Sequence, residues 1–106
     1  MNVYTIYADI QEGYDPKQFV INMRKFLDSL PTIASYRITR MKLGFRSMDL
    51  PEFRIDMEFK NLQQLDDAMT SVIRNEENIE GEHVGFNHLV DVETIQHFLY
   101  RDYPDE

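Results

Sequence analysis

The stretch Phe53-Arg54-Ile55-Asp56-Met57-Glu58-Phe59-Lys60 alternates apolar and charged side chains without a break. This period of two is typical of a β-strand that turns one face toward a core and the other face away from it. Charged side chains cannot sit unpaired in an apolar core. We therefore expect the uncovered face of this strand to carry Arg54, Asp56, Glu58 and Lys60.

The first thirty residues predict a strand followed by a helix. Residues 3–9 are rich in aromatic and β-branched side chains, which favours a strand. Asp15 and Pro16 suit the N-cap and the first position of a helix. Apolar residues then recur at helical spacing up to Leu30, and Pro31 ends the helix.

Residues 33–46 predict a long second strand that leads into the central one. Its apolar residues stand at even positions up to Ile38 and at odd positions from Met41 on. A β-bulge near Thr39 and Arg40 would produce that change. Residues 47–51 form the connecting loop, because the proline at position 51 prevents a strand from continuing through it.

The C-terminal part predicts a second helix and a last strand. Asn61 and Gln64 resemble a capping box, and apolar residues follow at helical spacing until Gly81 stops the helix. Residues 82–91 fit either another turn of helix or the approach to the next element. Residues 92–100 predict the fourth strand.

This order of elements, β-α-β-β-α-β in about a hundred residues, is that of the ferredoxin-like fold. The sequence therefore predicts an α+β sandwich that forms a single domain over residues 1–106. Two helices cover one face of a four-stranded antiparallel sheet, and the first and third strands are central. The charged face of the third strand is then either wet or the lining of a shared interior.

In element order and patterning the whole chain resembles the dimeric α+β-barrel superfamily. Within it the chain looks most like a small uncharacterised family of marine bacterial proteins. The resemblance implies a homodimer in which the open sheet faces of two copies line one interior, often a ligand pocket. Several enzymes of the superfamily are cofactor-free oxygenases, isomerases or dehydratases, and other members only bind. No catalytic motif of those enzymes is present, so no role can be transferred to a residue of this chain.

Charge and composition limit the partners. Residues 1–65 hold nine Lys and Arg against eight Asp and Glu, whereas residues 66–106 hold two against eleven, which gives a net charge of −8. An acidic surface repels phosphate backbones, so we expect no nucleic acid partner. The N-terminal residues lack the features of a signal peptide, and no apolar stretch approaches the roughly 20 residues of a membrane span. Since cysteine is absent as well, we expect a cytoplasmic protein without membrane contact.

The strand pattern yields two sets of candidate site residues. A pocket or dimer face would carry Arg40, Lys42, Arg54 and Lys60. Catalysis would draw on Asp56, Glu58, Tyr7 and His97, with a carboxylate as general base and Tyr7 as a donor. A satisfied ion network at a solvated or dimer face is the simpler explanation of the same charges and the one we favour. The orientation of the first strand stays open, because Tyr4, Ile6 and Ala8 form an inward set as plausible as one that places Tyr7 and Asp9 outside.

The histidines raise the question of a metal. His83 and His88 are five residues apart, and His97 follows nine residues later. Neither a helix nor a strand brings together two side chains that are five residues apart. We therefore predict no metal site. We also predict no cofactor, because the sequence contains no phosphate loop and no dinucleotide fingerprint. An RNA-binding surface is excluded as well, because Asp56 and Glu58 stand where a base would stack.

Two functional hypotheses follow. The first is a homodimeric small-molecule binding or structural module whose paired sheet faces are the functional surface. The alternative is a cofactor-independent enzyme, similar to an oxygenase, isomerase or dehydratase, with a polar site inside the dimer barrel.

Overall fold

The computed structural model describes residues 1–42, 50–74 and 88–104. Along these residues run β1 (Asn2–Ile10), α1 (Pro16–Ser29), β2 (Ser35–Arg40), β3 (Phe53–Phe59), α2 (Leu62–Ile73) and β4 (Val90–Arg101). The strands of the described part form one sheet in the order β2-β3-β1-β4, and every neighbouring pair is antiparallel. This confirms the predicted ferredoxin-like arrangement with β1 and β3 in the centre.

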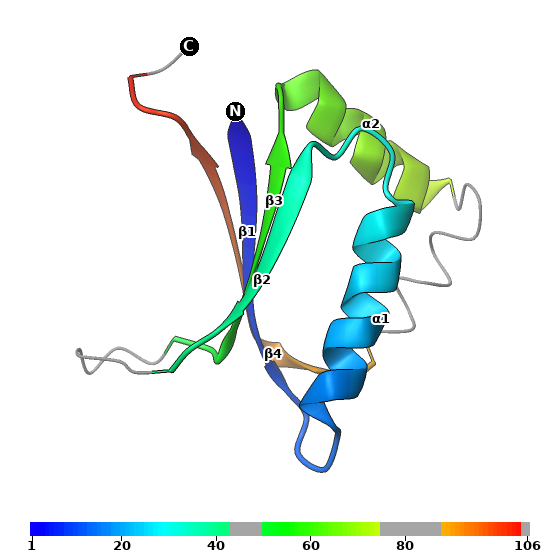
Figure 1. Cartoon of the computed structure of the whole chain (residues 1–106), viewed down its shortest axis with the longest axis vertical. Helices are drawn as coiled ribbons and strands as arrows, with labels where there is room; N and C mark the ends of the chain where they lie inside the picture. The colour runs from blue at the N-terminus through cyan, green and yellow to red at the C-terminus, as the bar shows by residue number, and fades with distance from the viewer. Residues whose placement is uncertain (43–49, 75–87, 105–106) are drawn as a thin grey trace.

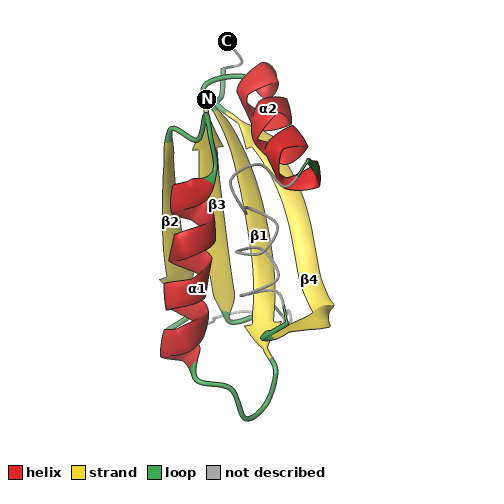
Figure 2. Cartoon of the chain, turned by 90° about the vertical axis from the view of Figure 1, so that its right-hand side faces the viewer, coloured by secondary structure: helices red, strands yellow, loops and turns green. Residues whose placement is uncertain are grey.

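The molecule has two layers. Both helices lie on the same side of the sheet (Figure 1). Seen from the helix side, α1 runs in front of β2 and β3, whereas α2 lies toward one end of the sheet (Figure 2). No described element covers the other face of the sheet. None of the helices in the described ranges is long and apolar enough to cross a membrane.

Both helices begin where the sequence places their caps. The Asp15 carboxylate accepts the backbone N–H of Lys17 at 2.9 Å, and the Asn61 side chain accepts that of Gln64 at 2.9 Å. The apolar stripe of α1 is buried, and α2 reaches its C-cap at Arg74. The expected stop of α2 at residue 81 lies outside the described residues.

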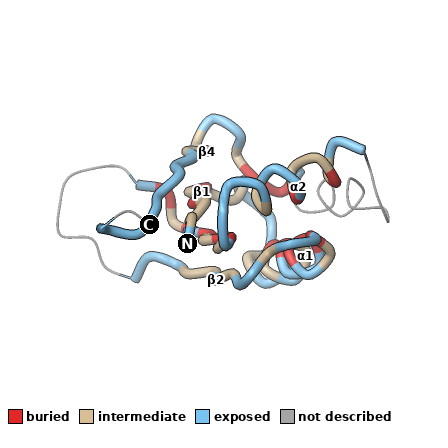
Figure 3. The backbone as a smooth tube through the Cα atoms, turned by 90° about the horizontal axis from the view of Figure 1, so that it is seen from above, coloured by how far each residue is buried: buried red, intermediate tan, exposed pale blue. Residues whose placement is uncertain are grey.

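The core lies between the helices and the inner face of β3. All four apolar residues of the alternating stretch are buried: Phe53, Ile55, Met57 and Phe59. Figure 3 shows buried segments along the central strands and along both helices. Tyr4, Ile6 and Ala8 are the cross-strand partners of Met57, Ile55 and Phe53. Because direct partners share a face, these three residues of β1 point toward the helices, and Tyr7 points away from them.

The predicted second strand is too long, and its bulge is wrong. Strand β2 ends at Arg40, and its pairing with β3 keeps one register from Ser35 to Arg40. The apolar pattern shifts without a bulge, because the next helix-side position after Ile38 is taken by Arg40. Arg40 is the partner of Phe53 and lays its guanidinium over the Phe53 ring. Residues 43–46 of the predicted strand lie outside the described residues.

The irregularity of the sheet lies in β4 instead. Tyr7 pairs with Gln96, but Asp9 pairs with Asp91, so β4 contains three more residues than β1 in this interval. The Asp9 backbone N–H donates to the Thr94 hydroxyl at 2.9 Å, which satisfies a donor that the ladder leaves free. Figure 2 shows the sharp bend of β4 that results.

Candidate functional site

The face of the sheet that the helices leave uncovered, which we call the open face, consists of three rows of cross-strand partners. In strand order β2, β3, β1, β4 these rows are Ser35–Glu58–Val3–Tyr100, Arg37–Asp56–Thr5–Phe98 and Thr39–Arg54–Tyr7–Gln96. The β2 and β3 half is polar and charged. The β1 and β4 half contains the aromatic side chains. The open face is therefore amphipathic across the sheet.

Asp56 is the centre of the polar half. The Thr5 hydroxyl donates to its Oδ1 at 2.6 Å, and Arg54 Nε lies 3.0 Å from its Oδ2. Thr5 is 0% exposed and the Asp56 side chain is 18% exposed, although no described element covers this face. Neighbouring side chains thus already desolvate this carboxylate. Its geometry is fixed by two donors from two strands.

The environment of Arg54 strengthens this pair. Burial lowers the pKa of the Arg54 guanidinium, but the hydrogen bond and charge of Asp56 outweigh burial and raise that pKa above its ordinary value. The guanidinium also lies 5.7 Å from the centre of the Tyr7 ring, within the range of a cation–π contact. Arg54 therefore links the carboxylate to the aromatic half.

An aromatic cluster of Tyr7, Phe98 and Tyr100 extends from β1 to the edge strand β4. The rings of Tyr7 and Phe98 meet edge to face with centroids 6.1 Å apart, and those of Phe98 and Tyr100 lie 6.3 Å apart. Phe98 is 42% exposed and Tyr100 is 51% exposed. This aromatic cluster therefore presents apolar surface directly beside a buried polar network.

Three of the four predicted catalytic residues share the open face: Tyr7, Asp56 and Glu58. Glu58 accepts the Ser35 hydroxyl at 3.1 Å. The structure does not bring His97 to them, because His97 pairs with Ile6 and so lies on the helix side. There its Nδ1 is 2.6 Å from the Tyr4 hydroxyl, and burial raises the pKa of Tyr4.

The predicted basic set is scattered. Arg54 is on the open face, whereas Arg40 is on the helix side and forms an ion pair with Glu52. Lys42 follows the end of β2, and Lys60 follows the end of β3. The prediction missed Arg37, which is the partner of Asp56 on β2. It also missed Thr5 and the aromatic pair of β4.

A small hollow lies at one end of the open face. It has a volume of about 190 Å³, and Tyr7, Arg54, Leu50 and Pro51 contribute to its lining. Ligand pockets typically measure roughly 300–1,000 Å³. The hollow of one chain is therefore small for a ligand, and a second surface placed over the open face would be needed to enlarge and close it.

The histidines of the described residues have aromatic neighbours. His88 packs edge to face on Tyr14 at 6.1 Å, and His97 contacts Tyr4. No group of three or more His, Asp or Glu residues in the described ranges is placed to hold a metal ion. His83 lies outside those ranges.

Comparisons with known proteins agree with the fold. All 106 residues match the model of DUF6614, a family of unknown function. The Arabidopsis thaliana protein At3g17210 superposes with a TM-score of 0.78 at 6% identity and covers 100% of this chain and 99% of its own. A dimeric ferredoxin-like protein of unknown function from Jannaschia sp. CCS1 gives a TM-score of 0.70 at 8% identity, with 95% and 98% covered.

A third solved structure has a described activity. SnoaB, a cofactor-independent oxygenase from Streptomyces nogalater, gives a TM-score of 0.63 at 12% identity, with 98% of this chain and 97% of SnoaB covered. At these identities the likeness shows the fold alone. No curated protein matches the sequence. The predicted marine bacterial origin stays a prediction.

Proposed function

For this chain, which belongs to the DUF6614 family of unknown function, we propose a homodimer in which the open faces of two copies meet. Residues 1–106 act as one domain, and the paired faces are its functional surface. The interior between them binds a small molecule or serves as a structural core. The dimeric description of the Jannaschia neighbour supports this arrangement.

The observation that carries the proposal is the amphipathic character of the open face. Phe98 and Tyr100 expose aromatic surface next to Tyr7, on a face that no described element covers. Exposed aromatic surface beside a buried polar cluster is typical of an interface or a ligand site.

Charge also permits two copies to meet there. The charged residues in the three rows are Arg37 and Arg54 against Asp56 and Glu58, which sum to zero in a chain whose net charge is −8. In a two-fold symmetric interface the same patch meets itself. A patch of one sign would repel its own copy, whereas this patch offers both signs.

A cofactor-independent enzyme is the second candidate. Asp56 supports it, because Thr5 and Arg54 hold a largely buried carboxylate that retains further acceptor sites for a proton. The described activity of SnoaB, on the same fold, also supports it. Asp56 would act as the base, with Tyr7 as a donor and Glu58 nearby.

Light scattering coupled to size exclusion tests the dimer. We expect the wild-type chain to elute with twice the mass of one chain, and Phe98→Glu to elute as a monomer because it places a charge in the apolar surface that the dimer would bury. Ile73→Glu is the matched control, since Ile73 is an exposed apolar residue of α2 on the helix side. A wild-type monomer at about 100 µM, well above typical dissociation constants of specific dimers, would refute the proposal.

A crystal structure of the dimer separates the candidate functions. A binding protein or an enzyme needs a cavity of at least about 300 Å³ between the sheets. An enzyme further needs Asp56 and Tyr7 to reach that cavity. An interior filled by aromatic side chains and paired charges supports the structural module and excludes the other two.

A further inference from the structure

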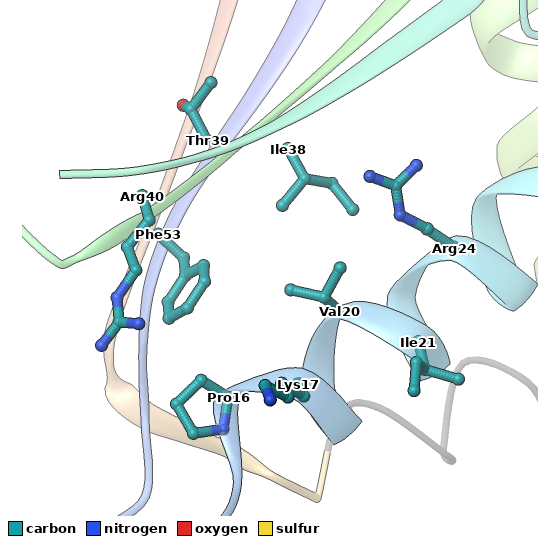
Figure 4. Close-up of a pocket in the computed structure, with 9 residues that line it drawn as sticks. All are labelled: Pro16, Lys17, Val20, Ile21, Arg24, Ile38, Thr39, Arg40 and Phe53. Atoms are coloured by element: carbon teal, nitrogen blue, oxygen red, sulfur yellow. The ribbon is translucent and has the colours of Figure 1, made fainter.

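A pocket lies on the helix side of the sheet, and it shares with the hollow of the open face only the edge-strand residues Thr39 and Arg40. It lies between α1 and the edge strand β2 and has a volume of about 500 Å³, within the usual range for small-molecule sites. Its floor is apolar and consists of Val20, Ile38 and Phe53, and Ile21 adds an exposed apolar rim. Figure 4 shows Val20, Ile38 and Phe53 in the space between helix and strand.

Cations surround this apolar floor. Lys17, Arg24 and Arg40 belong to the lining, and no carboxylate does. Figure 4 shows Arg24 and Arg40 on opposite sides of the pocket and Lys17 on the α1 side. Three positive residues and no negative one line a pocket in a chain that carries −8 overall, so the pocket differs from the rest of the protein in sign.

The cations are not equally available. Arg40 forms an ion pair with Glu52, and the charge of Arg24 acts on the Tyr36 hydroxyl, which donates to Asp28 at 2.7 Å. The Lys17 ammonium has no ion-pair partner among the residues that the structure describes. Salt screens charges beyond roughly 8 Å at physiological ionic strength. Acidic residues beyond that distance therefore do not set the charge of the pocket, and Lys17 is its one cation that neither an acidic partner nor an acid-bound tyrosine engages among the described residues.

We propose that this pocket, which we call the α1–β2 pocket, binds a small organic anion with an apolar body of about two fused rings. The body occupies the floor over Val20, Ile38 and Phe53. The anionic group lies at the rim, where Lys17 and Arg24 flank it from positions two turns apart on α1, about 10 Å along the helix axis. A guanidinium matches the two oxygens of a carboxylate. This site does not depend on the proposed homodimer, because it lies on the opposite side of the sheet.

Titration of the ¹⁵N-labelled chain with 2-naphthoate, followed by amide chemical shifts, tests the site. We expect saturable shifts at residues 17–24 and 38–40. The neutral 2-naphthamide has the same apolar body and should bind about tenfold more weakly or worse, because charged hydrogen bonds are lost. Equal binding of the two compounds, or shifts confined to the open face, would overturn the proposal.

Charge reversals in α1 provide the matched pair. Lys17→Glu should weaken 2-naphthoate binding by about tenfold or more. Lys25→Glu makes the same charge change at an exposed position of α1 outside the pocket lining and should leave binding within about twofold. Both side chains are exposed, so both variants should fold. Equal weakening by both would show a general charge effect and refute the site.

Two further outcomes are decisive. In Phe98→Glu the binding of 2-naphthoate should persist, whatever that variant does to the homodimer, so the two proposals fail independently. If the amides of residues 17–24 instead shift with protein concentration alone, and Ile21→Asp abolishes that shift, the pocket receives a second copy of the chain. That result would overturn the assignment of a small anion.

Discussion

Thr5 shows how a residue on an uncovered face can be fully buried. Its neighbours on the open face shield it, and its hydroxyl gives Asp56 one of its two donors. Replacing Thr5 by valine preserves the shape and removes that donor. The carboxylate stays desolvated and keeps only Arg54, so we expect the free energy of unfolding to fall by about 1–2 kcal/mol.

Urea unfolding at one fixed protein concentration measures this loss. Thr39→Val is the control, because the Thr39 hydroxyl reaches only the Arg54 carbonyl at 3.5 Å, at the limit of a hydrogen bond. The control should change the unfolding free energy by less than about 0.5 kcal/mol. Equal effects of the two variants would show that the bond from Thr5 to Asp56 contributes nothing specific.

The strands and helices differed in how far the sequence determined them. The alternation in β3 leaves one orientation possible, because the other would bury four charges. From it followed the placement of Asp56, Glu58 and Arg54 on the open face, whereas the fold followed from the order of the six elements. The Asp-Pro pair likewise predicted the start of α1 correctly, since a cap and a fixed φ are local properties.

The edge strands and β1 were harder to interpret because both of their faces carry apolar residues. In β4 the helix side has Ile95 and Leu99 while the open face has Phe98 and Tyr100, so alternation could not place His97. Long side chains add a further ambiguity. Arg40 lays its guanidinium over the Phe53 ring and pairs with Glu52, so a charged residue occupies a helix-side position that alternation alone would have assigned to the outer face.

The N-cap of α1 supports an entire wall of the α1–β2 pocket. Asp15→Ala leaves the Lys17 backbone N–H without its acceptor, and we expect a loss of about 1 kcal/mol in the free energy of unfolding. Asp15→Asn keeps a cap oxygen and should recover most of that loss. Thermal or urea unfolding measures both variants. If asparagine fails to recover stability, the charge of Asp15 and not its cap geometry is what stabilises α1.

The two layers leave the whole molecule asymmetric. One face of the sheet is covered by helices and the other carries exposed aromatic side chains. If the open face is covered only by a second copy, then folding and association are linked, and stability must depend on protein concentration. A monomer whose open face is simply wet has no such dependence. The melting temperature therefore tests the arrangement without any knowledge of a ligand.

We expect the melting temperature to rise by roughly 5–10 °C over a hundredfold increase in protein concentration. For a dimer that unfolds to single chains, this increase adds about 1.4 kcal/mol per chain, and each kcal/mol shifts the midpoint of a domain of this size by about 4–8 °C. Scanning calorimetry of the reversible transition measures the shift. Ile73→Glu should keep the concentration dependence, because Ile73 lies outside the three rows of the open face. Phe98→Glu should lose it and melt near the low-concentration limit of the wild type. A wild-type melting temperature that stays constant over the hundredfold range of protein concentration would mean that the aromatic cluster faces water in the native protein.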